Sequence, residues 1–331
     1  MKVLHVTNAY PTDADPGAGV FIKSQVESLR NAGLEVDVCV LEGTGIGKYL
    51  RGLRQLRAQA TCGGYDVIHA HYMYTGWVAR LSCRRPLVVS YMGSDVLGTT
   101  THSGRRRLLS FVLHLVGANL LALVASHVIV KSRQLRSLLL TRRQSLVPNG
   151  VDLDLFRPMD PVPTIARLSH DKRYVLFAGK PSNPRKRFWL AQHVMRLVQS
   201  ALPDAELVWL ERETPRQVAL FLNAVDCLLL TSTHEGSPNI LKEALACNLP
   251  VVSVDVGDAA ERIAGVDNCQ VVAAGEPPQL AAAVLGVLHS RRRSANGREA
   301  VAHLAITAVA QTIIGVYARC VRPSPRVTGH G

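Results

Sequence analysis

The sequence has no pair of cysteines at the Cys-x-x-Cys spacing. Its seven cysteines are scattered along the chain, and several of them stand in apolar runs. Clustered cysteines are the usual sign of a disulfide framework or a structural zinc site. We therefore expect buried free thiols in a reducing compartment, and no cysteine-bound metal.

Acidic residues are scarce in the first half of the chain. Residues 1–150 contain 18 Lys and Arg against 8 Asp and Glu, a net charge of +10, whereas residues 151–331 contain 20 against 17, a net charge of +3. This excess predicts an anionic partner for the first half: a membrane surface, a nucleic acid or an acidic glycan. No nucleic-acid-binding motif accompanies the charge, so no nucleic-acid partner is expected.

One basic segment has two interpretations. Leu and Arg both recur every three residues within residues 48–57. Such a segment is either a surface helix with a solvated charged face or a helix that contacts anionic lipid headgroups. A possible membrane surface is therefore retained as a partner of the first half.

The sequence also lacks the pattern of a leader peptide, because an apolar strand pattern begins at Lys2. One uncharged run, from Leu108 to Val130, is long enough to span a membrane, but it contains His114, Asn119 and other polar residues. We interpret it as a buried helix over residues 107–124 followed by a strand. The expected location is the cytoplasm, with or without peripheral attachment to the inner face of the cell membrane.

Strand and helix patterns alternate along both halves of the chain, and a new series begins at residue 174. This order predicts parallel sheets that bind ligands at the carboxyl ends of their strands. Between the halves, residues 147–158 contain two prolines and Asn149-Gly150, which is typical of a linker. We predict an α/β protein in which two Rossmann-like doubly wound domains, residues 1–155 and 156–305, face a cleft. A helix at 306–320 is expected to pack back towards the first domain, before a disordered tail at 321–331.

The strongest ligand-binding pattern lies at residues 227–245. An apolar run predicts a buried strand, and Ser237-Pro238 predicts a helix start with Ser237 as N-cap and Pro238 as the first helical residue. Glu235 lies in the loop, and Glu243 lies one to two turns into the helix. Free N–H groups at a helix start favour an anion, so the stretch suits a ligand with a phosphate and several hydroxyl groups. The alternative is that two glutamates stand beside a helix start by chance.

A second pattern follows the strand predicted at residues 174–179. Lys180, Arg185, Lys186 and Arg187 crowd the next loop, which is either a solvated charge run or a clamp for a phosphate. The clamp is favoured because the loop leaves the carboxyl end of a strand.

The loop Gly17-Ala18-Gly19 allows close backbone approach to a ligand. It is a poor dinucleotide fingerprint, because it comes late after the strand and Ile22 stands where a third glycine belongs. A dehydrogenase is therefore disfavoured.

Three further patterns resemble metal sites. His69 and His71 lie on one side of a predicted strand end without a third ligand. The pairs Asp13/Asp15 and Asp152/Asp154 lie in turn-rich loops, where aspartate is common for local reasons. We expect no metal site and no cofactor.

Four stretches, in the right order, resemble the retaining glycosyltransferases of the GT-B group, family 4. Glu235 and Glu243, within His-Glu-Gly-Ser-Pro-Asn and Glu-Ala-Leu-Ala, resemble that family's Glu-x7-Glu signature. Residues 147–158 resemble its linker motif, residues 66–71 and 93–95 resemble its first-domain strand ends, and residues 17–19 occupy the place of its glycine loop. The resemblance covers nearly all of residues 1–318.

The resemblance implies a nucleotide-diphosphate-sugar donor, bound mainly by the second domain without a metal. Glu235 would hold the sugar hydroxyls and Glu243 the ribose, while Lys180 and Lys186, with Arg185 as a competitor, would neutralise the departing diphosphate. The implied catalytic residues are Glu235, Lys186 and Lys180. The implied donor-binding residues are Gly17, Gly19, Arg185, Ser237, Pro238, Asn239, Ile240 and Glu243. His69, His71 and Asp95 are placed on the acceptor or sugar side.

One position departs from the family pattern. Met92 stands where family members often have a histidine that contacts the transferred sugar, and methionine cannot replace its hydrogen bond. Either His69 or His71 substitutes, or donor choice differs, or activity is weak.

The expected function is transfer of a hexose, with retention, from a nucleotide-diphosphate sugar to a glycan or lipid-linked acceptor in bacterial envelope or exopolysaccharide synthesis. Retention is compatible with front-face departure and attack or with a covalent intermediate. The alternatives are a GT-B nucleotide-sugar epimerase or phosphorylase, and a catalytically inactive sugar-nucleotide-binding subunit.

Overall fold

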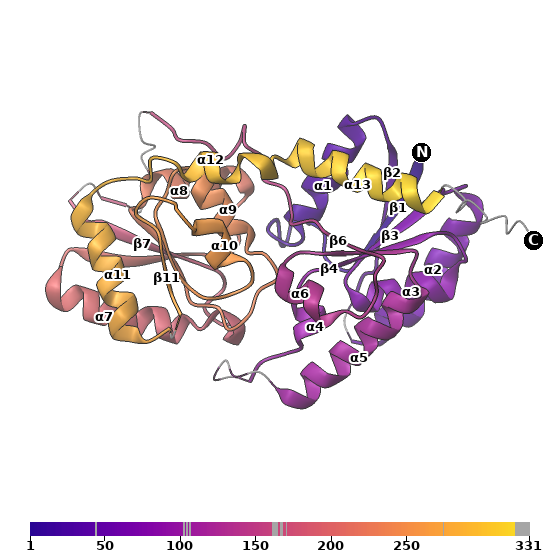
Figure 1. Cartoon of the computed structure of the whole chain (residues 1–331), viewed down its shortest axis with the longest axis horizontal. Helices are drawn as coiled ribbons and strands as arrows, with labels where there is room; N and C mark the ends of the chain where they lie inside the picture. Colours follow the sequence, from indigo (N-terminus) through magenta and orange to yellow (C-terminus); the bar gives the residue numbers. More distant parts are fainter. Residues whose placement is uncertain are drawn as a thin grey trace, which may run out of the picture.

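The computed structural model describes residues 1–43, 45–101, 103, 105, 107–160, 165, 168–169, 171–273 and 275–321. They form two α/β domains that lie side by side (Figure 1), each built on one sheet. The first sheet has the strand order β2-β1-β3-β4-β5-β6 and the second β11-β10-β9-β7-β8, and the strand pairs are parallel. The predicted fold class is confirmed.

The N-terminal sheet is buried by helices on both faces. Its strands are β1 (Lys2–Thr7), β2 (Glu35–Val40), β3 (Val67–His71), β4 (Leu87–Tyr91), β5 (His127–Val130) and β6 (Gln144–Leu146). The helices along the same segment are α1 (Val20–Asn31), α2 (Gly47–Cys62), α3 (Met73–Ser82), α4 (Ser94–Leu97), α5 (Leu108–Val124) and α6 (Arg133–Leu138). The strands β3 and β4 are buried along their whole length because helices cover both sides of the sheet, and most of their residues are apolar; the exceptions are His69, His71 and Ser90.

The C-terminal domain repeats this plan around a single hydrophobic core. Its strands are β7 (Arg173–Ala178), β8 (Ala205–Leu210), β9 (Cys227–Leu230), β10 (Val251–Val254) and β11 (Gln270–Val272). Its helices are η1 (Pro184–Lys186), α7 (Phe188–Ala201), α8 (Pro215–Ala224), α9 (Asn239–Ala246), α10 (Ala259–Ile263), α11 (Pro277–Ser290), α12 (Gly297–Val301) and η2 (Ala302–Leu304).

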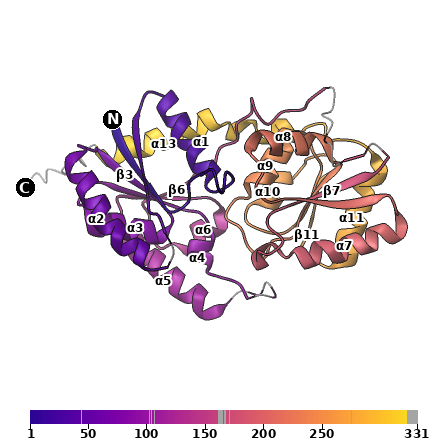
Figure 2. The same ribbon diagram turned by 180° about the vertical axis from the view of Figure 1, so that it is seen from behind.

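The chain crosses between the domains twice, and the two crossings are paired. Val151 forms a parallel bridge with Ala305, and the backbone N–H of Ile306 donates to the carbonyl of Val151 at 2.8 Å. The last helix, α13 (Ile306–Val321), then packs against α1 on the N-terminal domain (Figure 2). Val321 ends this helix, and the rest of the predicted tail lies outside the described residues.

The bounds of α5 agree closely with the predicted helix, but the prediction that it is buried is wrong. Only Ala118, Leu121 and Ala122 are buried within it. Helices α3 and α4 contact one side of α5, and the opposite side is exposed. The apolar composition of the run led to the prediction of burial, but composition does not determine how much of a helix surface the rest of the chain covers. None of the described helices has the length and apolar character needed to cross a membrane.

Candidate active site

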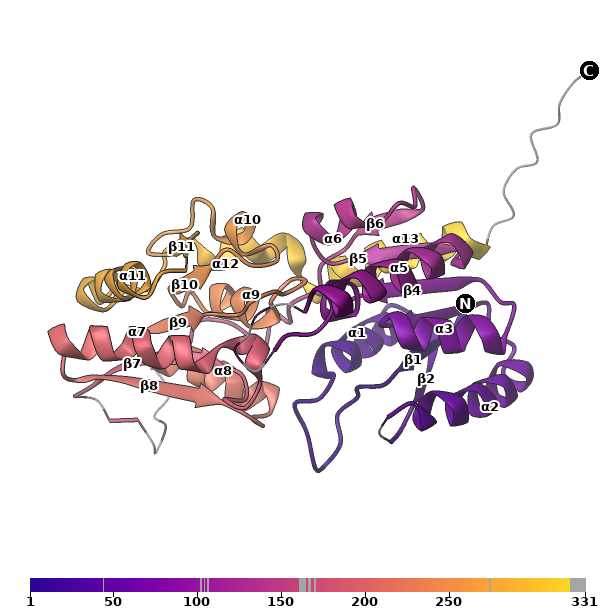
Figure 3. The ribbon, with the colours of Figure 1, turned by 90° about the horizontal axis from the view of Figure 1, so that it is seen from below.

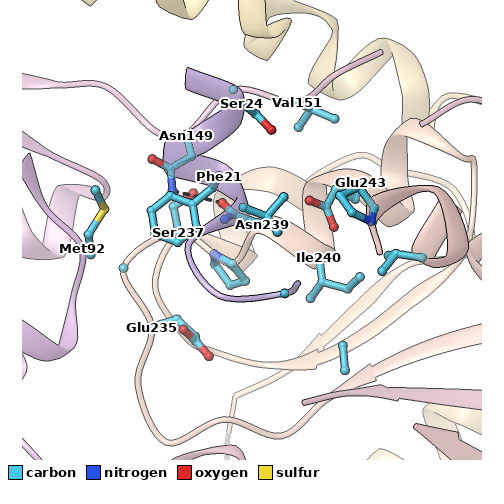
Figure 4. A pocket seen from close by; sticks show the side chains of 18 of the residues that line it. Phe21, Ser24, Met92, Asn149, Val151, Glu235, Ser237, Asn239, Ile240 and Glu243 are labelled. Atoms are coloured by element: carbon cyan, nitrogen blue, oxygen red, sulfur yellow. Dashed lines mark hydrogen bonds between the residues drawn. The ribbon is translucent and has the colours of Figure 1, made fainter. Parts of the chain in front are cut away.

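A cavity of about 460 Å³ lies between the domains, within the range of small-molecule sites. The C-terminal sheet reverses its strand order between β7 and β9, and open α/β sheets bind ligands at such a point. Residues that follow these two strands line the cavity, together with residues of α1 and the linker (Figure 4). The cavity collects nine of the residues predicted for the donor: Gly17, Arg185, Lys186, Glu235, Ser237, Pro238, Asn239, Ile240 and Glu243.

Glu235 forms the centre of a charged cluster in this cavity. Its Oε1 lies 2.5 Å from Nη1 of Arg185 and 2.7 Å from Nζ of Lys186. Burial alone would raise the pKa of Glu235, but the charges and hydrogen bonds of Lys186 and Arg185 outweigh it and lower the pKa to about 2. The cavity therefore holds an ionised carboxylate between two fixed cations.

The loops that carry this cluster brace one another. The backbone N–H of Thr233 donates to the carbonyl of Arg185 at 2.8 Å, and Arg185 Nη1 donates to the carbonyl of His234 at 3.1 Å. Arg187 Nε donates to the carbonyl of Thr231 at 2.5 Å. These bonds join the loop after β7 to the loop after β9, so the cations are held in position before any ligand binds.

The structure does not bring Lys180 into this cluster. Lys180 is exposed, is not among the cavity-lining residues, and forms an ion pair with Asp15 across the domains at 3.1 Å. The side chain that shares Glu235 with Lys186 is Arg185. In this structure Lys180 therefore lies apart from the cluster that was predicted to include it, and Asp15 is its ion-pair partner.

The start of α9 is one residue later than predicted. Pro238 is the N-cap in an extended conformation, and Asn239 is the first helical residue. Ser237 does not cap the helix, because its Oγ donates to Oδ2 of Asp258 at 2.9 Å. Within the described part of the chain, no side chain caps the first turn of α9. Its backbone N–H groups, next to the cavity, are therefore suited to an anion.

Glu243 lies across the cavity from Glu235, with Asn239 and Ile240 between them (Figure 4). Burial raises the pKa of the Glu243 carboxyl to about 7, although the Lys242 charge opposes the rise. A carboxyl group in this position can accept hydrogen bonds from ligand hydroxyl groups, and it does so most strongly when ionised.

The glycines of the site have different roles. Gly17 lines the cavity, whereas Gly19 shapes its loop: its φ is +62°, and a Cβ there would lie 2.2 Å from the carbonyl oxygen of Ala9. Sequence reasoning missed Gly236, where a Cβ would lie 2.1 Å from the carbonyl oxygen of Met92. The backbones of the two domains thus meet at Gly236, beside Glu235.

Asp95 and the two predicted histidines do not line the cavity. Asp95 accepts hydrogen bonds from the N–H groups of Met92 and Gly93 at 2.9 and 2.8 Å, and burial raises its pKa to about 6 despite these bonds. It shapes the loop that meets Gly236. His69 and His71 are fully buried and lie outside the cavity lining, whereas Met92 lines it.

No third histidine stands near His69 and His71 along the chain, but the fold brings His5 beside them. This happens because β1 pairs with β3, which places His5 opposite His69. One nitrogen from each ring lies within 4.8 Å of the others, a spacing that could hold a metal ion. Hydrogen bonds account for the arrangement: His5 contacts His71 at 2.9 Å and the Tyr317 hydroxyl at 3.1 Å, and His69 contacts that hydroxyl at 2.5 Å and Ser90 at 2.8 Å. Burial lowers the pKa of His5 to about 3, so the ring is neutral. The cluster attaches α13 to the sheet.

Two buried lysines that sequence reasoning missed hold the linker. Lys242 Nζ donates to the carbonyl of Asn149 at 2.8 Å, and Lys131 Nζ donates to the carbonyl of Val147 at 3.1 Å. Burial lowers the pKa of Lys242 to about 8 and that of Lys131 to about 7. The only sequence signal was a lysine beside apolar residues, within α9 for Lys242 and directly after β5 for Lys131.

Two Rossmann-like domains that face a cleft define the GT-B class of fold. Sucrose-phosphate synthase from Thermosynechococcus elongatus has the same fold, with a TM-score of 0.78, 18% identity, and coverage of 96% of this chain and 99% of that one. HepE from Anabaena, solved with UDP and glucose, gives a TM-score of 0.67 with 17% identity over 96% of this chain and 99% of its own.

The family follows from the sequence matches. Residues 17–155 match "Glycosyltransferase Family 4", and residues 160–290 match "Glycosyl transferases group 1". A protein of Bacillus subtilis (strain 168) named as a teichuronic acid biosynthesis glycosyltransferase, TuaC, is 26% identical over 78% of this chain and 82% of its own length. D-inositol 3-phosphate glycosyltransferase 2 of Catenulispora acidiphila is 26% identical over 95% and 84%. The chain belongs to the group 1 glycosyltransferases of the GT-B fold.

Proposed function

We propose that the protein transfers a hexose, with retention at the anomeric carbon, from a nucleotide-diphosphate sugar to a glycan or lipid-linked acceptor. The observation that carries the proposal is the position of Glu235 between Arg185 and Lys186, at the strand-order reversal of the donor-side sheet.

The cluster suits departure of a nucleoside diphosphate. When the bond between the anomeric carbon and the β-phosphate oxygen breaks, negative charge develops on the leaving group. Arg185 and Lys186 would take up that charge, so we assign the second cation to Arg185 in place of Lys180. Glu235, released from part of its ion pairing, would hold the sugar hydroxyls. Because the cations are side chains, we propose that the step needs no metal.

The donor would lie along the start of α9. The free N–H groups of the first turn would bind phosphate, and Glu243 would accept hydrogen bonds from the ribose hydroxyls. UDP-sugars are the first donors to test, since HepE was solved with UDP and with UDP-glucose.

The acceptor is proposed to be acidic or membrane-anchored, as in bacterial envelope or exopolysaccharide synthesis. The name of TuaC contains teichuronic acid, and the names of the inositol enzymes contain D-inositol 3-phosphate, so each name includes an acidic compound. The net charge of +10 over residues 1–150 is complementary to such acceptors and to anionic lipid headgroups. Vesicle binding that is indifferent to both salt and anionic lipid would contradict the electrostatic part of this proposal.

The test is donor hydrolysis without acceptor, over UDP-, GDP- and ADP-hexoses, with and without EDTA. We expect slow release of sugar from one donor, unchanged by EDTA, with the anomeric configuration retained when NMR is recorded early in the reaction. The Glu235→Ala variant should lose this activity. Absence of both hydrolysis and nucleotide binding across the panel would overturn the proposal.

Met92 motivates a second candidate, an inactive sugar-nucleotide-binding subunit. Met92 lines the cavity beside Ser94, where its thioether offers the transferred sugar no N–H or O–H donor. Nucleotide-sugar binding without turnover over the whole panel would favour this candidate. A gain of turnover in Met92→His would then show that the missing donor group is the cause.

A further inference from the structure

Helix α5 presents an unusually apolar face to solvent. Eight large apolar side chains are exposed on this one helix, and the exposed fraction of Leu108 reaches 75%. At 3.6 residues per turn they fall within an arc of about 160°. We call them the α5 face: Leu108, Leu109, Val112, Leu113, Val116, Leu120, Leu123 and Val124. A contiguous exposed patch of this kind marks an interaction site in a soluble domain.

The α5 face continues onto its neighbours. Exposed Tyr74 of α3 contacts His114 of α5 through its hydroxyl at 3.4 Å, and the backbone N–H of exposed Leu140 donates to Oδ1 of Asn119 at 2.8 Å. The helix lies at the lower edge of the N-terminal domain in Figures 1 and 2, opposite α13, and Figure 3 views the protein from that edge.

Cations flank the α5 face, and its segment of the chain contains almost no acids. Residues 67–151 contain eleven Lys and Arg but only one acid, Asp95, which is buried. Exposed Arg107 directly precedes α5, and Nη2 of exposed Arg143 donates to the carbonyl of Leu123 near its other end at 3.1 Å. Exposed Arg84 and Arg85 follow α3, the helix packed beside α5.

We propose that the α5 face inserts into the surface of a lipid bilayer with anionic headgroups. The helix would lie parallel to the membrane, with its apolar side chains at the acyl boundary and the flanking arginines at lipid phosphates. With 17 residues, α5 is about 25 Å long, too short to span a hydrocarbon core of about 30 Å. A second copy of the chain fits less well, because a symmetric contact would place the same arginines together without acids to pair them.

The position of α5 would bring the membrane close to the cleft. Met92 and Ser94 line the cavity, and Ser94 begins the short helix α4. Gly98 ends α4 and packs so tightly on α5 that a Cβ there would lie 2.8 Å from the backbone nitrogen of Phe111. A lipid-linked acceptor in the bound bilayer would therefore approach the cavity from the α4 side. The inference gives the membrane partner of the proposed function a location, but it does not depend on the transfer chemistry.

The experiment is flotation of the full-length protein with vesicles of phosphatidylcholine, alone or with 30% phosphatidylglycerol. The variant combines Leu109→Gln, Leu113→Gln and Leu120→Gln, and the matched control is Val321→Gln, an exposed aliphatic residue on α13. We expect the wild-type protein and the control to bind anionic vesicles, and the triple variant to bind at least about tenfold more weakly. Raising the salt concentration should weaken wild-type binding without abolishing it, because salt screens only the charged part.

Two results would overturn the inference. One is unchanged vesicle binding by the triple variant at both low and high salt. The other is a wild-type dimer in sedimentation that the triple variant loses, which would assign the α5 face to a second copy. Circular dichroism confirms that the variant is folded. Donor hydrolysis, measured without vesicles in the same samples, separates failure of this inference from failure of the proposed transferase activity.

Discussion

Replacing Glu235 by glutamine tests the charged cluster directly. Glutamine keeps the size of the side chain and removes its charge, so Arg185 and Lys186 lose their shared partner. The Glu235 side chain is only 14% exposed, so water screens the pair weakly.

The magnitude follows from the pKa of Glu235. A fall from 4.5 to about 2 corresponds to about 3 kcal/mol in favour of the ionised form. Because the folded-state pKa is depressed, this contribution is fully present above pH 4.5 and is lost as the pH falls towards 2. We therefore expect Glu235→Gln to reduce the free energy of unfolding by about 3 kcal/mol at pH 7, and turnover by more than about 100-fold.

The assay is urea denaturation of the wild type and the variant from pH 7 down to the lowest pH at which both fold. The difference between them should shrink steadily below pH 4.5. The control is Glu261→Gln, since Glu261 forms a more exposed ion pair with Arg262 at 3.2 Å, and its loss should cost less than about 1 kcal/mol. A difference for Glu235→Gln that is below 1 kcal/mol, or that does not change with pH, would refute the reasoning.

Four further predictions follow from the same geometry. Lys186→Ala should lower kcat by about 100-fold, whereas Lys180→Ala, which removes an exposed ion pair outside the cavity, should change it less than about threefold; steady-state kinetics that show equal losses would contradict the placement of Lys180. Gly236→Ala should separate the domains, because its Cβ would lie 2.1 Å from the carbonyl oxygen of Met92; small-angle scattering should show a larger radius of gyration, and an unchanged one would contradict this close contact. Donor affinity, measured by calorimetry with a nucleotide sugar, should rise as the pH increases through about 7 and Glu243 ionises; persistence of the same pH dependence in Glu243→Gln would exclude this carboxyl as its source. Tyr317→Phe should lower the free energy of unfolding by about 2 kcal/mol, because buried His5 and His69 each lose a hydrogen-bond partner; a denaturation curve that matches the wild type would rule out the network as the attachment of α13.

Much of the C-terminal half of the site could be predicted from the sequence. The loop with Glu235 and the helix with Glu243 depend on local signals: an apolar strand, a proline near a helix start, and the helical period. Even there the boundary moved by one residue, because Ser237 bonds to Asp258, which lies in the next loop rather than in its own helix.

Other features could not be predicted because they depend on which strands become neighbours. Glu235 meets Lys186 because β9 pairs with β7, and His5 joins His69 because β1 pairs with β3. Residue spacing along the chain does not determine strand order, so neither the charged cluster nor the histidine network was visible beforehand. The same limit applies to Lys180, whose partner is Asp15 of the other domain.

The sequence by itself determined the α/β class, the two-domain division, the basic first half and the residue types that suit a phosphate and a sugar, because these are properties of composition and local periodicity. Only the tertiary structure decided that Arg185 and Lys186 stand beside Glu235, that His69 and His71 are buried under α13, and that α5 keeps one face uncovered. Each of these outcomes depends on packing between segments that are distant in the chain. Apolar residues show that a surface needs a partner, whereas the fold decides whether that partner comes from the chain itself.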